Sequence, residues 1–188
     1  ADEIRSQLNG NNITYVVNRN INYTNICVYS CSFCAFSKST GAKKLRGASY
    51  LLELEEIQNR VREAIRRRAT EVCLQGGIHP KFDGNYYLDV IKAIRKVSPD
   101  IHIHAFSPLE IFQGAQTLGL TLEEYLPILK EAGLNSLPGT AAEILHDDVR
   151  NIICPDKLNT AEWLSVMDAA HSCGLNSTAT IMFGHVET

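Results

Sequence analysis

The sequence lacks several features that mark membrane-embedded, secreted or nucleic-acid-binding proteins. No apolar run approaches the ~20 residues that a helix needs to span a bilayer. The first residues include Asp2, Glu3 and Arg5, so they lack the apolar core of a secretory signal. The net charge of −3 gives no general attraction to nucleic acid or to an anionic membrane. We therefore expect no nucleic-acid or membrane partner, and a reducing location, either the cytoplasm or a reducing organelle.

The chain has 188 residues, which is enough for one domain with a sizeable core. No low-complexity linker divides it. There is no initiator Met, and a strand-like run lies directly before the last residues, Val186-Glu187-Thr188. We expect a single domain over residues 1–188 that belongs to a longer protein and is incomplete at its C-terminal side.

Strand-like and helix-like segments alternate along the chain. Short runs of branched and aromatic residues predict strands, and apolar residues at three- and four-residue steps predict helices. The expected strands lie within residues 14–23, 70–75, 101–106, 134–137 and 176–183. The expected helices lie within residues 1–12, 51–68, 86–97, 109–118, 122–132 and 160–173, and residues 38–47 are expected to form a loop. This alternation indicates an α/β fold with a parallel sheet, either barrel-like or doubly wound. Ligand sites of such sheets lie beyond the carboxyl ends of the strands.

Three cysteines follow the first expected strand with the spacing Cys-x3-Cys-x2-Cys, at Cys27, Cys31 and Cys34. Three thiolates on a short loop can bind one soft metal centre. Structural zinc requires four protein ligands, and the nearest further candidates are Cys73 and His79. A ferredoxin pattern would close an iron–sulfur cluster with a fourth cysteine. A four-iron cluster held by three cysteines would leave one iron open to a substrate.

Other interpretations of these cysteines are a zinc site, a disulfide with a spare thiol, and buried apolar thiols. A disulfide would need an oxidising compartment, which nothing in the sequence indicates. A segment that also contains Asn, Ser and Tyr fits a buried strand poorly. The iron–sulfur interpretation is therefore preferred, and the remaining cysteines, Cys73, Cys154 and Cys173, are expected to be core thiols.

The cysteine spacing, with the aromatic Phe33 directly before Cys34, resembles the motif of the radical S-adenosylmethionine (radical SAM) enzymes. The resemblance implies a [4Fe–4S] cluster, one per chain, whose open iron is chelated by the amino and carboxylate groups of S-adenosyl-L-methionine (SAM). An electron from the cluster then cleaves the sulfonium to give a 5′-deoxyadenosyl radical, and Phe33 lies against the adenine. The resemblance also implies a partial (β/α)6 TIM-like barrel, with about five βα units present here and the last strand missing.

Polar or glycine-rich residues follow each expected strand, where the resemblance places SAM. Gln75, Gly76 and Gly77 end the second strand at the position of the family's glycine-rich motif, which accepts the SAM amino group. Ile78 replaces the usual acidic residue of that motif, so the backbone would have to accept the amino group. A plain turn is the structural alternative. Ser107 ends the third strand and is expected to reach the ribose of SAM.

Two charged residues and a second motif complete the expected SAM site. Glu143 is expected to bind a ribose hydroxyl or the SAM ammonium group, and Lys157 the SAM carboxylate. Ordinary charge near a helix terminus is the alternative for both. Residues 180–187 resemble the family's adenine-lining motif Gly-x-Ile-x-Gly-x-x-Glu through Ile181, Gly184 and Glu187, although the first glycine is either replaced by Ala179 or lost.

His102 and His104 alternate on the third expected strand and so share one face of it. If that face is the barrel interior, they are candidates to hydrogen-bond substrate or to act as catalytic acid and base. Both faces of a parallel strand are buried, so satisfied core histidines are the alternative.

Longer segments resemble the tyrosine-using half of the FO synthase family, which makes the 8-hydroxy-5-deazaflavin chromophore. The matching segments are residues 15–25, 74–80, 102–108, 137–145 and 153–157. The resemblance implies transfer of the 4-hydroxybenzyl group of L-tyrosine to 5-amino-6-(D-ribitylamino)uracil. It also implies an electron donor and a ring-closing radical SAM partner, as a subunit or a fused half. Two alternatives stay open: a radical SAM relative of the futalosine route to menaquinone, and a non-catalytic module that binds an iron–sulfur cluster or zinc.

Overall fold

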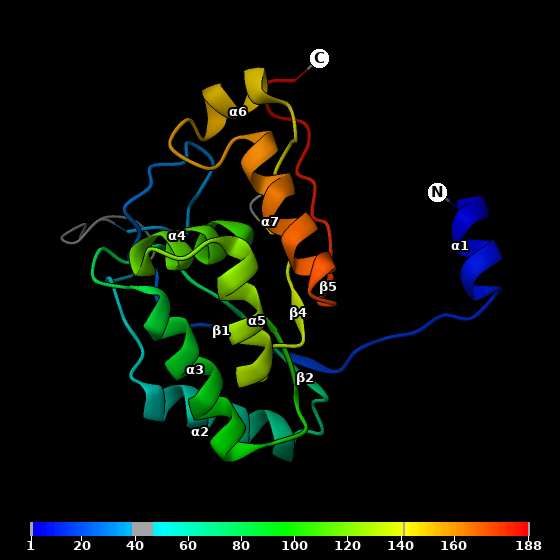
Figure 1. Ribbon diagram of the computed structural model, residues 1–188, viewed down its shortest axis with the longest axis vertical. Helices are drawn as coiled ribbons and strands as arrows, with labels where there is room; N and C mark the ends of the chain where they lie inside the picture. The colour runs from blue at the N-terminus through cyan, green and yellow to red at the C-terminus, as the bar shows by residue number, and fades with distance from the viewer. Residues whose placement is uncertain (1, 39–46, 141, 188) are drawn as a thin grey trace.

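Five parallel strands form one sheet, and their order in the sheet is their order in the chain (Figure 1). The structure is a computed structural model that describes residues 2–38, 47–140 and 142–187. The strands are β1 (Asn18–Asn22), β2 (Glu71–Gln75), β3 (His102–Ala105), β4 (Ser136–Leu137) and β5 (Asn176–Ser177). The helices are α1 (Asp2–Asn9), α2 (Leu54–Arg66), α3 (Gly84–Val97), α4 (Pro108–Leu118), α5 (Leu122–Ala132), α6 (Asp147–Ile153) and α7 (Thr160–Ser172). Most of the loop predicted over residues 38–47 lies outside the described residues.

The sequential strand order decides between the two predicted architectures. A doubly wound sheet reverses its strand order at a switch point, whereas a (β/α) barrel adds each new strand beside the last. The order β1-β2-β3-β4-β5, with helices between the strands, is that of a partial barrel. The α/β prediction is confirmed, and the doubly wound alternative is wrong.

One face of the sheet packs against the helices and forms the hydrophobic core. Ile21, Leu74, Ile103 and Leu137, one from each of the first four strands, are completely buried. They belong to one cluster with apolar side chains of the surrounding helices. Burying each such side chain contributes about 1.5–3 kcal/mol, so this face fixes how the strands sit against the helices.

The opposite face carries polar residues in register, and it is the interior of the partial barrel. One row crosses all five strands, and we call it the polar row: Asn20, Cys73, His104, Ser136 and Asn176. All except Ser136 are at least partly exposed. The row therefore offers hydrogen-bonding groups toward the space that the barrel encloses.

Local signals in the sequence explain most helix boundaries. Helix α5 covers the predicted residues 122–132, between a Thr121 capping box and Gly133, whose φ of +117° suits glycine. Helix α2 begins at Leu54, three residues later than residue 51, where the prediction starts, and no side chain caps its first turn. Helix α7 begins at Thr160, as predicted, and the Asn159 side chain caps its first turn.

Two predictions fail where the sequence pattern is weak. Helix α6 was not predicted, because its seven residues are too few to show an apolar stripe. The fifth strand was predicted over residues 176–183 but spans only Asn176–Ser177, and Ile181 forms a single bridge to Glu143. Helix α1 has no buried residue and stands apart from the rest of the chain in Figure 1. Within the described ranges, no helix has both the length and the apolar character needed to cross a membrane.

Candidate active site

A cavity of about 380 Å³ lies at the carboxyl ends of the strands. All three cysteines of the Cys-x3-Cys-x2-Cys motif line it. So do most of the residues predicted to bind SAM, namely Phe33, Gln75, Gly76, Gly77, Ser107, Glu143 and Lys157. Residues that are far apart in the chain therefore meet where a parallel sheet places its ligands.

Close backbone contact joins the cysteine loop to the end of β2. A Cβ atom on Gly77 would overlap the carbonyl oxygen of Ile26 and lie 2.9 Å from the Cβ of Cys27. The backbone N–H of Ile78 points to Cys27 Sγ at 3.4 Å, and Val28 N–H donates to the Ile78 carbonyl at 2.9 Å. Only glycine allows this approach, so the position of Cys27 depends on Gly77.

The three cysteines are free thiols that share one cavity. Burial raises the pKa of Cys31 to about 11, and the nearby Lys157 ammonium opposes that shift. A bound metal would displace the proton, because the thiolate is the ligand form. Within the described part of the chain, no three His, Cys, Asp or Glu side chains converge on a point suited to one metal ion.

An ion pair lies beside the cysteines. Lys157 Nζ is 3.1 Å from Glu143 Oε1, and it also lies 5.4 Å from the centroid of the Phe33 ring. Neither charged residue belongs to a helix. Glu143 has a φ of +52°, which is unusual for a residue other than glycine, as has Phe106 at the end of β3 with +60°.

Arg150 holds the two segments that carry this ion pair. The side chain is 2% exposed, and its Nε donates to the Leu158 carbonyl at 3.0 Å. Its guanidinium also donates to the Ala142 carbonyl. Leu158 directly follows Lys157, and Ala142 directly precedes Glu143. Arg150 lies in the unpredicted helix α6, so the sequence analysis gave no reason to single it out.

The predicted ligand Ser107 lines the cavity, but its hydroxyl group is partly engaged. Ser107 caps α4 and donates its hydroxyl proton to Glu110 Oε2 at 2.5 Å. A SAM hydroxyl could therefore only donate to Ser107. The helix predicted over residues 109–118 begins one residue earlier in the structure, at Pro108.

His102 and His104 share one face of β3, as predicted, and that face is the barrel interior, but neither side chain lines the cavity. Their rings both contact Ser136 Oγ, from His102 Nε2 and from His104 Nδ1, at 2.7 Å each. Burial lowers the pKa of His104, the Glu71 carboxylate opposes the shift, and His102 adds to it. A catalytic role for either histidine stays a prediction.

The predicted adenine-lining motif does not reach the cavity. Ile181 is 53% exposed, and Gly184 has a φ of +90° in an exposed turn. The Glu187 carboxylate accepts backbone hydrogen bonds from Gly184 and His185, and these hold its pKa at about 2. The backbone bridge between Ile181 and Glu143 brings this segment beside one predicted ligand, but Ile181, Gly184 and Glu187 do not line the cavity.

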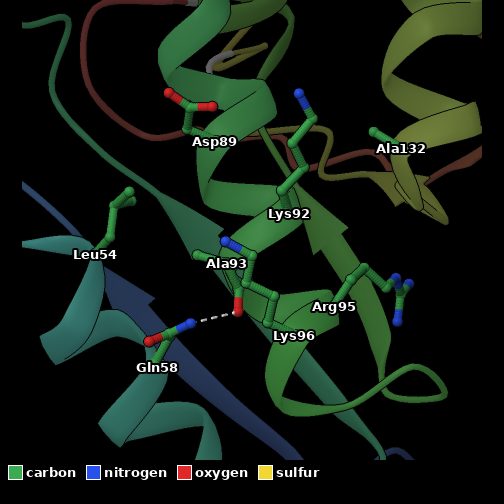
Figure 2. Close-up of a pocket in the computed structure, with 8 residues that line it drawn as sticks. All are labelled: Leu54, Gln58, Asp89, Lys92, Ala93, Arg95, Lys96 and Ala132. Carbon is green, nitrogen blue, oxygen red and sulfur yellow. Dashed lines mark hydrogen bonds between the residues drawn. The ribbon is translucent and has the colours of Figure 1, made fainter.

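A second hollow lies on the outer surface, among α2, α3 and the end of α5, and holds none of the predicted site residues (Figure 2). Gln58 Nε2 donates across it to the Ala93 carbonyl at 3.0 Å. The Arg95 guanidinium donates to backbone carbonyls, including that of Ile101 at 2.7 Å. The Arg95 guanidinium therefore holds loops together. The hollow is a weaker candidate for the active site than the cavity.

The sequence analysis missed Glu110, which also lines the cavity and is 1% exposed. The segment Ser107-Pro108-Leu109-Glu110 is a capping box, in which Ser107 and Glu110 each bond the backbone of the other. That pattern was present in the sequence. It predicts the start of a helix, but it does not predict that the carboxylate faces a ligand cavity.

The fold and the cavity define the class of this protein. The family model of the Radical SAM superfamily matches residues 21–188, and the chain belongs to this superfamily. Methylornithine synthase has a similar fold, with a TM-score of 0.67, 18% identity, and coverage of 93% of this chain and 46% of that chain. HydG, a maturase of the [FeFe]-hydrogenase, has a TM-score of 0.66 and 20% identity, and the match covers 97% of this chain and 38% of that chain.

Curated relatives are much more similar to this chain in sequence than these two structures are. The 5-amino-6-(D-ribitylamino)uracil–L-tyrosine 4-hydroxyphenyl transferase of Archaeoglobus fulgidus is 52% identical over 188 residues, which are 100% of this chain and 52% of that protein. The protein with the same name from Methanocaldococcus jannaschii is 50% identical over 190 aligned positions, again 100% of this chain and 52% of the relative. The chain thus spans about half the length of the curated relatives it matches.

Proposed function

We propose that this chain forms the core of a radical SAM transferase that moves the 4-hydroxybenzyl group of L-tyrosine to 5-amino-6-(D-ribitylamino)uracil, in FO biosynthesis. The observation that carries the proposal is 52% identity over all 188 residues to a relative with that transferase name. The cavity supports it, because it gathers three cysteines, a glycine-rich strand end and an ion pair.

Cys27, Cys31 and Cys34 are the proposed ligands of one [4Fe–4S] cluster. When bound, the cluster and SAM supply the 5′-deoxyadenosyl radical that takes hydrogen from the tyrosine. The cysteines fit such a cluster, because each thiolate would bind a different iron and all three side chains line one cavity. A single zinc ion needs ligands that converge, and the described residues offer no such group.

Backbone and side-chain groups of the cavity are proposed to bind SAM. No described residue donates a hydrogen bond to the carbonyl oxygens of Gly76 and Gly77, so both can accept from an ammonium group. Lys157 offers a cation for a carboxylate, while its partner Glu143 can accept from a hydroxyl or ammonium group. Phe33 provides a flat apolar surface for the adenine beside them.

Polar groups of the barrel interior are proposed to hold the two substrates. Asn20 and Asn22 line the cavity, His104 is in register with Asn20, and His102 lies two residues nearer the amino end of β3. Ser136 has one hydroxyl proton, so it can donate to at most one of the two imidazoles and accepts from at least one. With its pKa lowered, His104 is neutral near pH 7 and can take a proton.

The test is an assay of the full-length enzyme, reconstituted without oxygen and given SAM, a chemical reductant, tyrosine and the diaminouracil. We expect 5′-deoxyadenosine together with an adduct that has the mass of the uracil plus the 4-hydroxybenzyl group. Deoxyadenosine without adduct would reject the substrates, and the substrate of the futalosine route should then be assayed. No SAM cleavage at all would favour a non-catalytic module.

We also propose two partners, an electron donor and a second radical SAM unit that closes the deazaflavin ring. The transfer reaction needs the donor because the cluster must be reduced before each SAM cleavage. Addition of the ring-closing unit to the assay should convert the adduct to a product with deazaflavin absorbance.

A further inference from the structure

One carboxyl group connects the ends of β1 and β3 beside the cavity. The Glu110 Oε1 atom accepts a hydrogen bond from the Tyr23 hydroxyl. The Oε2 atom accepts from the Ser107 backbone N–H at 2.7 Å and from the Ser107 hydroxyl at 2.5 Å. Tyr23 directly follows β1, and Ser107 lies two residues beyond the end of β3. Glu110 thus joins two strand ends that are remote in the chain.

The Tyr23 ring extends this connection to β2 and toward the cysteines. The ring packs so closely on Gly76 that a Cβ atom there would lie 2.9 Å from Tyr23 Cδ2 and overlap two further ring atoms. Tyr23 N–H also donates to the Gln75 carbonyl at 3.3 Å. Gly77, the next residue, contacts Cys27. A shift of the Tyr23 ring would therefore move the glycine-rich strand end and disturb the cysteine loop.

Both carboxyl oxygen atoms of Glu110 are engaged with groups of the protein itself. Its two oxygen atoms already accept from Tyr23 and Ser107, and the side chain is 1% exposed. Burying a carboxyl group is costly, and an apolar side chain of similar size would satisfy the fold at lower cost. Burial raises the pKa of Glu110 to about 7, and the hydrogen bonds from Ser107 and Tyr23 oppose that shift. A buried carboxyl group that lowers stability at this position indicates that Glu110 has a functional role at the cavity.

We propose that Glu110 is a positioning residue for SAM binding. Through Tyr23 it fixes the backbone of Gly76, and through Ser107 it fixes the end of β3. The Gly76 carbonyl oxygen accepts no hydrogen bond from a described residue. The inference rests on the proposed function in one respect, since it takes SAM as the occupant of this cavity.

The test compares Tyr23→Phe and Glu110→Gln with the wild type in full-length enzyme reconstituted with iron and sulfide. Tyr23→Phe removes one hydroxyl, and Glu110→Gln replaces one acceptor by an amide donor at constant size. We measure iron content, the thermal midpoint, the dissociation constant of SAM, and the electron paramagnetic resonance spectrum of the reduced cluster with and without SAM. The expected result is near-normal iron, a SAM dissociation constant raised about tenfold, equivalent to roughly 1.4 kcal/mol, and a smaller spectral change on adding SAM.

Tyr125→Phe is the matched control. Tyr125 is also completely buried, and its hydroxyl donates to the Gly84 carbonyl at 2.7 Å, outside the cavity lining. It should lower the thermal midpoint as much as Tyr23→Phe does and leave SAM binding unchanged. Wild-type SAM affinity and spectra in both Tyr23→Phe and Glu110→Gln, or an equal loss in Tyr125→Phe, would overturn the proposal. Failure of both variants to fold would assign Glu110 to folding and overturn it too.

These readouts need neither tyrosine nor the uracil. A failure of the proposed transferase activity, with SAM still cleaved, would therefore leave the inference standing. A failure of the inference would leave the adduct assay of the wild type unaffected.

Discussion

The Lys157 ammonium group lies 3.1 Å from the Glu143 carboxylate, and each side chain is 12% exposed. Little water reaches either charge, so each depends on the other, whereas an exposed pair such as Arg60 and Glu56 is well solvated. The pair forms one side of the cavity that the three cysteines line. Its charges therefore matter both for stability and for a zwitterionic ligand.

Lys157→Ala should lower the free energy of unfolding of the metal-free enzyme by about 3 kcal/mol, because it leaves the Glu143 carboxylate buried without a partner. Urea unfolding measures this. Replacing both partners, with Lys157→Met and Glu143→Leu together, should recover most of the loss. The control Arg60→Ala should stay within about 0.5 kcal/mol of the wild type. An equal effect of Lys157→Ala and Arg60→Ala would show that the pair is solvated after all.

Gly77→Ala should sharply reduce the iron bound after reconstitution. The added Cβ would overlap the Ile26 carbonyl and press on Cys27, and backbone cannot move aside as a flexible side chain can. Iron content and cluster absorbance measure the effect. Gly10→Asn is the control, because Gly10 has open space around it and a φ of +59° that Asn tolerates. Wild-type iron in Gly77→Ala would contradict the link between this glycine and the cysteine loop.

Cys31→Ala should abolish the cluster absorbance and the SAM-dependent spectral change, because it removes one of three proposed iron ligands. Cys173→Ala should keep both, since Cys173 lies outside the cavity and donates to the Ala170 carbonyl. Chemical iron analysis of the two variants shows whether Cys31 is an iron ligand. Four irons retained per chain in Cys31→Ala would reject the ligand assignment.

The stability of the metal-free enzyme should fall between about pH 4.5 and pH 7 relative to Glu110→Gln. The Glu110 carboxyl has a pKa of about 7 in the folded chain and an ordinary value of 4.5, so the folded chain holds the proton more tightly. The stabilisation is complete below pH 4.5 and is lost as the pH rises through 7, by roughly 3 kcal/mol in total.

Urea unfolding at several pH values measures this difference. The titratable groups that face Glu110 include Tyr23, Tyr86, Tyr87 and Cys73, and burial raises the pKa of each above its ordinary value, so they stay neutral in this range. The change therefore belongs to the carboxyl group. A wild type and a Glu110→Gln variant with parallel pH profiles would contradict the raised pKa.

Much of the fold was predictable because its signals are local. Helix α5 lies between a capping Thr121 and Gly133, and both residues act within one turn of the helix. The fifth strand failed for the opposite reason. Its apolar run Ile181-Met182-Phe183 predicts a strand, but pairing requires a neighbouring strand, and Phe183 is 83% exposed. Local composition does not determine whether a partner strand is present.

The candidate site also has a part that local sequence signals predict and a part that depends on long-range contacts. The cysteine spacing lies within one short segment, so the sequence alone gave the three candidate ligands. The Tyr23–Glu110 hydrogen bond joins residues 87 positions apart, and no local pattern predicts such a contact. Lys157 and Glu143 were predicted through the family resemblance, while Arg150, which holds both segments, lies in a helix too short to predict.

The polar row also bears on how reliably the sheet assembles. Because side chains alternate along a strand, a slip of β3 by one residue would turn His102 and His104 toward the helices and leave Ile103 in water. A wholly apolar sheet could tolerate such a slip at little cost. Here the misaligned form would bury imidazoles without hydrogen-bond partners among apolar side chains, which costs free energy. The polar residues of the barrel interior therefore disfavour incorrect strand alignment during folding, before any ligand is present.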